Sequence, residues 1–272
     1  MNEFDIWFGT EASYYELQRL LSIEPQLGWF DSEPDNPIKY EVVEGIAVAN
    51  ISGPLISKPT FFSRYVGITS YEDVKEFLSD MAGDRNVNAV LFNYDTPGGA
   101  AKGCRACASF VREYAESLKP VYSITEEVAA SAGLWLYSSG LVHFVSEDGR
   151  LGSVGAIAMH SEVTEMRKKA GITDTIFRTA KFKALGGPFE KLSDDAKAEI
   201  EEGLQILHDQ FVDGISELSG INREKVDKSI ATGKVFRADR SMELGLADEL
   251  LPLGEVIGKL AAKHKKPSKP KS

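Results

Sequence analysis

Apolar residues recur along this chain with two different spacings, which alternate from residue 40 to residue 244. Short runs in which almost every residue is apolar, such as 89–93, predict buried strands. Longer segments with apolar residues three or four positions apart, such as 71–82, predict helices with one buried face. The alternation of the two indicates an α/β fold with a mainly parallel sheet and crossover helices.

The same spacings assign an element to much of the chain. Strands are predicted at 41–51, where a turn divides the run in two, and at 89–93, 121–124, 141–145, 155–158 and 174–178. Helices are predicted at 13–22, 71–82, 103–118, 194–218, 222–230 and 238–244, with one more directly after Ser131.

Three regions follow from this pattern. Residues 1–38 are expected to form an N-terminal arm or helical connector, because prolines interrupt any regular element after residue 24. Residues 39–256 carry the alternating pattern and form the main domain. Residues 257–272 form a basic tail of lysine and proline, which is expected to be disordered or to contact an acidic partner.

Charge and hydropathy narrow the class of protein. The formal net charge is −10, whereas a surface that binds nucleic acid or anionic lipid needs an excess of basic residues. No apolar run reaches the roughly 18 residues that a membrane helix requires. The first residues lack the basic segment and apolar run of a secretory signal. We therefore expect a cytoplasmic protein with no membrane contact and no nucleic acid as its primary ligand.

The two cysteines, Cys104 and Cys107, stand in a Cys-x-x-Cys arrangement that can indicate redox chemistry or half of a zinc site. The chain has no second cysteine pair, and no histidine lies nearby in the sequence. Both thiols are expected to pack on the inner face of the helix at 103–118. The sequence therefore predicts neither a metal site nor a cofactor.

Ser131 is the first candidate for chemistry, because small residues surround it in the run Val-Ala-Ala-Ser-Ala-Gly at 128–133. A nucleophile at a strand-to-helix corner needs this composition, since the turn is tight and the hydroxyl has to stay uncovered. Close helix packing produces similar runs, so Ser131 alone does not decide between the two.

Gly98 and Gly99 are the second candidate, because they follow the apolar strand at 89–93. Ligand sites in parallel α/β folds lie at the carboxyl ends of strands, which is where both this turn and Ser131 are expected. Consecutive glycines leave backbone N–H groups free to hold an oxyanion. A plain sharp turn is the alternative, and a phosphate loop is excluded because no Gly-Lys-Ser/Thr run follows.

A serine nucleophile needs a base, and the sequence offers Lys183 or His160. Lys183 lies among apolar residues and glycines, where burial could lower its pKa from about 10.4 to roughly 7.5, a change worth about 4 kcal/mol. An ordinary basic loop is the competing interpretation of this segment. His143 is expected to be structural, and the two remaining histidines lie on a long helix and in the tail.

Three ordered blocks resemble the signal peptide peptidase A family of serine–lysine peptidases, within the ClpP/crotonase superfamily. They are 91–99 with its Asp-Thr-Pro-Gly-Gly end, Ser-Ala-Gly at 131–133, and Gly-Ser-Val-Gly at 152–155. The Gly-Leu-Ala-Asp-Glu-Leu run at 245–250 and the Ser-Gly-Pro-Leu run at 52–55 are similar to the phage branch, the lambda-type capsid assembly proteases. The resemblance covers about residues 40–255 and implies the superfamily's repeated β-β-α spiral.

The resemblance also implies roles for individual residues. Ser131 would be the nucleophile and Lys183 the general base, as the family's lysine lies five residues before a proline and Lys183 precedes Pro188 by five. The oxyanion hole would be formed by the N–H groups of Ala132 and of Gly99, with Gly98 as the alternative donor. Ser153 would orient the lysine amine. Peptides would be cleaved through an acyl-enzyme while bound as an extended strand beside the glycine-rich segment.

The implied function is a prohead protease that assembles as a homo-oligomer and trims scaffold, portal or other head proteins. Lambda-type proteases often carry a C-terminal scaffolding extension, so we expect the scaffold to be a separate protein or to have been removed. The alternatives are a cytoplasmic housekeeping peptidase, a crotonase-type acyl-CoA enzyme that would not need Lys183, and a non-catalytic component of capsid assembly.

Overall fold

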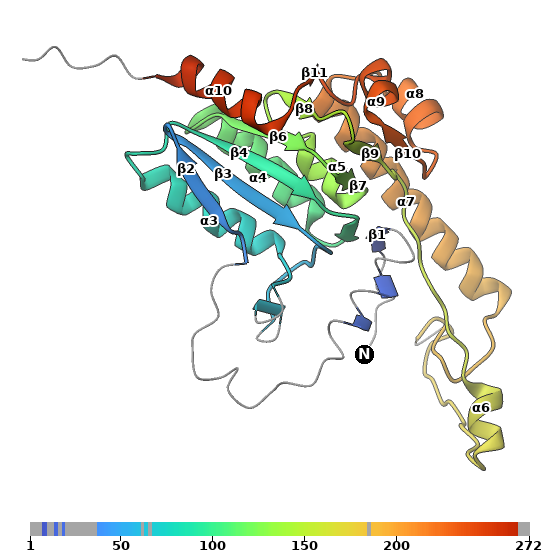
Figure 1. Cartoon of the computed structure of the whole chain (residues 1–272). Coiled ribbons are helices and arrows are strands. Elements are labelled where there is room, and N and C mark those ends of the chain that lie inside the picture. Colours follow the sequence, from blue (N-terminus) through green and yellow to red (C-terminus); the bar gives the residue numbers. More distant parts are fainter. Residues whose placement is uncertain are drawn as a thin grey trace, which may run out of the picture.

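The computed structural model describes residues 7–9, 14–15, 18–19, 37–60, 63–64, 67–183 and 186–265. A six-stranded sheet lies at its centre, in the order β11-β8-β6-β4-β3-β2 (Figure 1). All neighbours in this sheet are parallel except the hairpin of β2 and β3, which confirms the predicted mainly parallel arrangement. The strands are β2 (Tyr40–Val43), β3 (Ile46–Ser52), β4 (Ala89–Asp95), β6 (Val121–Thr125), β8 (His143–Val145) and β11 (Glu249–Leu250).

Helices cover both faces of this sheet, so its central strands are apolar on both sides. Ala47 and Val90 face a core that includes side chains of α3 (Tyr71–Gly83) and α4 (Cys104–Ser117). Their neighbours Ile46 and Leu91 face a second core, which α10 (Leu253–His264) closes. This explains why β3 and β4 appear in the sequence as continuous apolar runs.

A second sheet contains the strands that end at the candidate site. It has the order β10-β9-β7 and consists of β7 (Val128–Ala130), β9 (Arg150–Gly152) and β10 (Val235–Arg237). The short strand β5 (Gly98–Ala100) lies beside it and pairs with β1 (Trp7–Gly9). None of these three-residue strands is long enough to show a periodic pattern in the sequence.

The long helix α7 (Asp194–Ser219) packs against α5 (Ala132–Tyr137), the short helix after Ser131. The Trp135 indole stacks on Phe211 with ring centroids 4.8 Å apart and an interplanar angle of 12°. Gly214 permits this approach, because a Cβ there would lie 2.3 Å from Trp135 Cζ2. The remaining helical elements are α8 (Arg223–Lys225), the π-helical turn η2 (Val226–Ile230) and α9 (Ala238–Leu244).

Two predicted strands are wrong. Residues 155–158 contain a single bridge residue, Ile157, and 174–178 contain no strand. Both lie in the segment between β9 and α7, which runs away from the central sheet and has α6 (Thr164–Lys169) at its far end (Figure 1). No strand in the described part of the chain offers these residues an edge, and α6 has no buried residue.

The predicted boundary at residue 256 falls inside α10, which continues to His264 because Val256, Leu260 and Ala261 are buried against the sheet. Residues 266–272 of the predicted tail and most of the predicted helix at 13–22 lie outside the described residues. Within the described ranges, no helix is long and apolar enough to cross a membrane.

Candidate functional site

Ser131 stands at the corner between β7 and α5, in a backbone conformation that residues other than glycine rarely adopt. Its φ is 53° and its ψ is −120°. The residue is fully buried, and its Oγ has no hydrogen-bond partner among the described residues. A strained corner with an unpaired hydroxyl resembles the backbone of a nucleophile elbow, but this hydroxyl is buried, whereas the sequence predicted that it stays uncovered.

Ser153 occupies the equivalent position at the end of the neighbouring strand. β7 and β9 are parallel, with Ala130 opposite Gly152. The ladder continues one step further, since the Ser131 N–H donates to the Gly152 carbonyl oxygen at 2.8 Å. Ser153 follows with a φ of 58°. The carboxyl ends of two paired strands therefore bring Ser131 and Ser153 side by side, while the role of Ser153 toward the lysine amine stays a prediction.

The backbone of β5 gives different surroundings to the two glycines that the sequence offers as oxyanion donors. The Gly98 N–H donates to Thr96 Oγ1 at 3.2 Å, so it is already in use. Leu55 pairs with the Gly98 oxygen and with the Ala100 N–H, both at 2.9 Å. Since N–H directions alternate along a strand, the Gly99 N–H faces the opposite edge, where β1 pairs with β5 and Phe8 lies opposite Gly99. A Cβ at Gly99 would lie 2.1 Å from the Leu55 oxygen, so this approach requires glycine.

Thr96 holds the glycine turn beside Ser131, a role that no pattern in the sequence indicates. Its N–H donates to the Val128 carbonyl oxygen at 2.8 Å, and its own carbonyl oxygen accepts from the Ala130 N–H at 3.0 Å. Its methyl group would lie 2.4 Å from a Cβ at Gly133, so glycine lets α5 approach the turn closely. Ala132 begins α5, and its N–H therefore has no acceptor within the helix.

The structure does not bring Lys183 to this cluster. Lys183 is exposed, and it lies between α6 and α7 in the segment that runs away from the central sheet. Its neighbour Lys181 forms an ion pair with Asp195 at 2.7 Å, at the start of α7. His160, the alternative base, is half-buried in the same segment. The assignment of the base thus stays a prediction.

A groove of about 920 Å³ begins at Ser153. One wall is the chain from Val154 to Met159, and the other includes Leu204 and Gln205 of α7. The chain along the first wall lies mostly outside regular strands, with one bridge residue at Ile157, and the Val154 carbonyl oxygen accepts from the Gly233 N–H at 3.2 Å. His208 also lines the groove, where Asp227 lies 3.3 Å from its Nε2.

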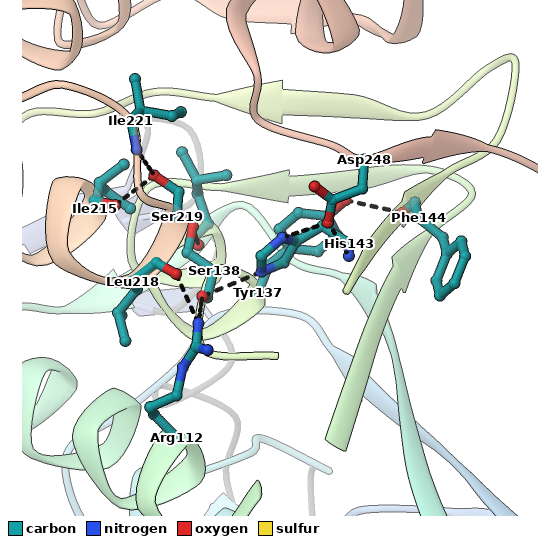
Figure 2. A network of polar contacts seen from close by, with 11 residues as sticks. Arg112, Tyr137, Ser138, His143, Phe144, Ile215, Leu218, Ser219, Ile221 and Asp248 are labelled. Carbon is teal, nitrogen blue, oxygen red and sulfur yellow. Dashed lines mark hydrogen bonds and ion pairs between the residues drawn. The ribbon is translucent and has the colours of Figure 1, made fainter. Parts of the chain in front are cut away.

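His143 belongs to a structural network, as expected (Figure 2). Its Nδ1 lies 3.0 Å from Asp248 Oδ2, and its Nε2 lies 3.2 Å from the Ser138 carbonyl oxygen. The hydrogen bond with His143 lowers the pKa of Asp248 below its ordinary value. Arg112 donates to the same Ser138 oxygen at 3.1 Å and to the Leu218 oxygen at 2.6 Å, so the network ties α4, α5, α7 and β8 together.

Cys104 and Cys107 are buried and free, which confirms that both thiols pack on the inner face of α4.

Comparison with known proteins settles the family. The model of peptidase family S49 matches residues 113–266, which include Ser131, Ser153 and Lys183. The chain belongs to peptidase family S49. Gly98 and Gly99 precede the matched region.

Several curated proteins are similar to the chain. It is 29% identical to capsid assembly protease C of Escherichia phage lambda over 227 residues, or 84% of this chain and 51% of that protein. It is 28% identical to the head-tail preconnector protein GP5 of Enterobacteria phage P21, over 82% of this chain and 44% of that protein. Protease 4 of Haemophilus influenzae is 28% identical over 83% of this chain and 36% of its own length. The chain spans about half the length of the curated relatives it matches.

Solved structures confirm the fold. An enoyl-CoA hydratase/isomerase family protein from Silicibacter pomeroyi superposes with a TM-score of 0.50 at 16% identity, over 83% of this chain and 82% of that one. An enoyl-CoA hydratase from Shewanella pealeana gives a TM-score of 0.52 at 9% identity, over 89% and 79%. These similarities support the predicted crotonase-like α/β architecture and nothing about the reaction.

Proposed function

We propose that this S49 chain is a serine endopeptidase with Ser131 as nucleophile and Lys183 as general base. Ser131 Oγ attacks the carbonyl carbon of a peptide bond while its proton passes to the Lys183 amine. The resulting oxyanion accepts hydrogen bonds from the N–H groups of Gly99 and Ala132. Collapse breaks the C–N bond and the lysine proton goes to the leaving amine. Water then hydrolyses the ester on Ser131.

The observation that carries this proposal is the geometry of Ser131. Its hydroxyl is unpaired in the described part of the chain, and its backbone is held at a φ of 53°. The N–H groups of Gly99 and Ala132 come from the two segments packed around it, β5 and the start of α5. A packing residue would need neither the strain nor the nearby donors.

The position of Lys183 adds a requirement to the proposal. A base has to lie within about 3 Å of the hydroxyl that it deprotonates. Lys183 instead lies on the projecting segment, so the dyad forms only when this segment folds back or when the segment of a second copy reaches Ser131. The second route agrees with the predicted homo-oligomer.

The proposed substrates are phage head proteins such as scaffold or portal, cleaved in the host cytoplasm within assembling proheads. The names of the relatives from phages lambda and P21 support this proposal. A cytoplasmic peptidase is the second candidate, supported by the similarity to protease 4 and to a putative signal peptide peptidase of Enterococcus faecium.

The test uses a fluorophosphonate probe and a library of fluorogenic peptides. The wild-type chain is expected to be labelled at Ser131 and to cleave library peptides, while Ser131→Ala and Lys183→Ala lose cleavage. Full activity in Lys183→Ala with loss in His160→Ala would replace the base. Mixing Ser131→Ala with Lys183→Ala restores cleavage only if the dyad forms between copies. Cleavage of scaffold at defined sites, compared with general degradation of casein, separates the two classes of substrate.

A further inference from the structure

Two buried side chains contact the segments that carry the proposed oxyanion donors, and the proposed chemistry uses neither. Tyr71 begins α3 and Cys104 begins α4. The exposed fraction is 1% for Tyr71 and 0% for Cys104. Burial raises the pKa of both groups, so each keeps its proton and can act as a donor.

Tyr71 is bonded both to β5 and to the segment that pairs with it through Leu55. Its hydroxyl donates to the Ala100 carbonyl oxygen at 2.5 Å, directly after Gly99 in the chain. Its backbone N–H donates to the Ile56 oxygen at 2.9 Å, directly after the Leu55 that pairs with β5. One residue therefore fixes β5 relative to its neighbour.

Cys104 contacts Ala132, the residue that carries the other proposed donor. Its Sγ lies 3.7 Å from the carbonyl oxygen of Ala132, to which the thiol donates. Cys104 also interacts with the Tyr71 side chain, so the two groups form one buried layer. At Gly103 a Cβ would lie 3.1 Å from Tyr71 Cδ2, tighter than most real contacts, so the glycine there helps this layer to close.

We propose that Tyr71 and Cys104 are positioning residues that set the separation and direction of the Gly99 and Ala132 N–H groups. This role rests on the proposed function. Losing an oxyanion donor outright lowers kcat by about 10²–10³, and a donor that is only displaced should lower it less, by about 10-fold.

The test compares two identical chemical changes in the full chain. Tyr71→Phe removes the hydroxyl bonded to Ala100. Tyr137→Phe is the matched control, since its equally buried hydroxyl donates to the Phe144 oxygen at 2.9 Å, away from β5. With the best library peptide, Tyr71→Phe is expected to lower kcat about 10-fold at unchanged KM, whereas Tyr137→Phe keeps the wild-type kcat. Cys104→Ala should behave like Tyr71→Phe, and Cys104→Ser should recover activity because it keeps a donor.

Equal kcat values in Tyr71→Phe and Tyr137→Phe, with an active wild type, would overturn the positioning role and leave the proposed function standing. An unlabelled and inactive wild-type chain would overturn both.

A second observation concerns the free edge of β5. β1 pairs with it in antiparallel register, with Phe8 opposite Gly99 and Gly9 opposite Gly98. The other edge is taken by Leu55, so β1 lies on the edge toward which the Gly99 N–H and C=O point. This is the edge along which a substrate strand is expected to bind.

Two further contacts hold the N-terminal arm across the same region. Tyr14 packs against Ile68, as do Ala100 of β5 and Ile157 of the groove wall. The Tyr15 hydroxyl donates to Met159 Sδ at 3.7 Å, on that same wall. The described residues of the arm thus contact both β5 and the groove wall.

We infer that β1 occupies the substrate edge of β5 and competes with peptide substrates for it. This inference deepens the proposed function by naming a regulator of the same site. Phe8→Pro removes the N–H that faces Gly99, while Phe8→Ala keeps it. Phe8→Pro is expected to lower KM for the library peptide about 10-fold at unchanged kcat, and Phe8→Ala is expected to leave KM closer to the wild-type value.

Adding a synthetic peptide of residues 5–12 should raise the KM of Phe8→Pro again, as a competitive inhibitor does. An unchanged KM in Phe8→Pro would overturn the inference while the enzyme remains active. If no variant is active, anisotropy decides independently of catalysis. The labelled peptide should then bind Phe8→Pro more tightly than wild type, and equal binding would overturn the inference.

Discussion

Replacing Ser131 by alanine is expected to stabilise the protein. The hydroxyl is buried and unpaired within the described residues, and a buried polar group without a partner costs about 1–3 kcal/mol. Alanine removes this penalty and keeps the backbone conformation. The free energy of unfolding should therefore rise by about 1–2 kcal/mol, which for a chain of this size raises Tm by about 2–4 °C per kcal/mol.

Glycine at position 131 separates the cost of the buried hydroxyl from the cost of the backbone conformation. A non-glycine residue in a sparsely populated conformation costs about 1–3 kcal/mol, and glycine loses about 0.5–1 kcal/mol of this gain through entropy. Ser131→Gly is thus expected to exceed Ser131→Ala in stability, because φ is 53° at this position.

Ser138→Ala is the matched control for the hydroxyl. Ser138 is also buried, but its Oγ donates to the Leu134 oxygen at 2.8 Å, so its loss should lower stability by about 1 kcal/mol. Differential scanning calorimetry at one fixed protein concentration measures all three variants. A Tm of Ser131→Ala at or below the wild-type value would refute the conclusion that this hydroxyl is unsatisfied.

Two further predictions concern stability away from the site. Gly214→Ala should destabilise the protein by about 2 kcal/mol, because its Cβ would lie 2.3 Å from the Trp135 ring. Gly203→Ala has open space around its Cβ and should raise Tm slightly. Thermal melts compare the two variants. Asp248→Asn should cost about 1 kcal/mol, since the carboxylate is 52% exposed. Its pKa is depressed by His143, so this stability is present above pH ~4 and is lost as pH falls through the lower folded value. Urea titrations should show that the unfolding free energies of the wild type and of Asp248→Asn converge toward pH 3.

The sequence predicted the central sheet well, because burial on both faces leaves a local signature. The run at 89–93 is apolar at four of its five positions and lies within β4. In contrast, β5, β7 and β9 each have three residues, and their pairing depends on partners far away in the chain. The run at 174–178 has a strand-like composition, yet it meets no edge among the described residues.

The candidate site divides in the same way. Ser131 and the glycine turn stood out because tight corners demand small residues. Tyr71 did not, and Cys104 was predicted only to pack on the inner face of its helix, since the fold alone aims each side chain at a carbonyl oxygen. Where Lys183 lies is decided by the path of a long segment, which no local pattern records.

The two buried thiols report how often the packed helices around them open. Thiol reagents attack the thiolate, and burial raises the pKa of Cys107 to about 12 and that of Cys104 as well. Neither thiol can react while α4 stays packed against α3 and α5. The rate of alkylation therefore measures how often the layer next to β5 and α5 opens in the native protein.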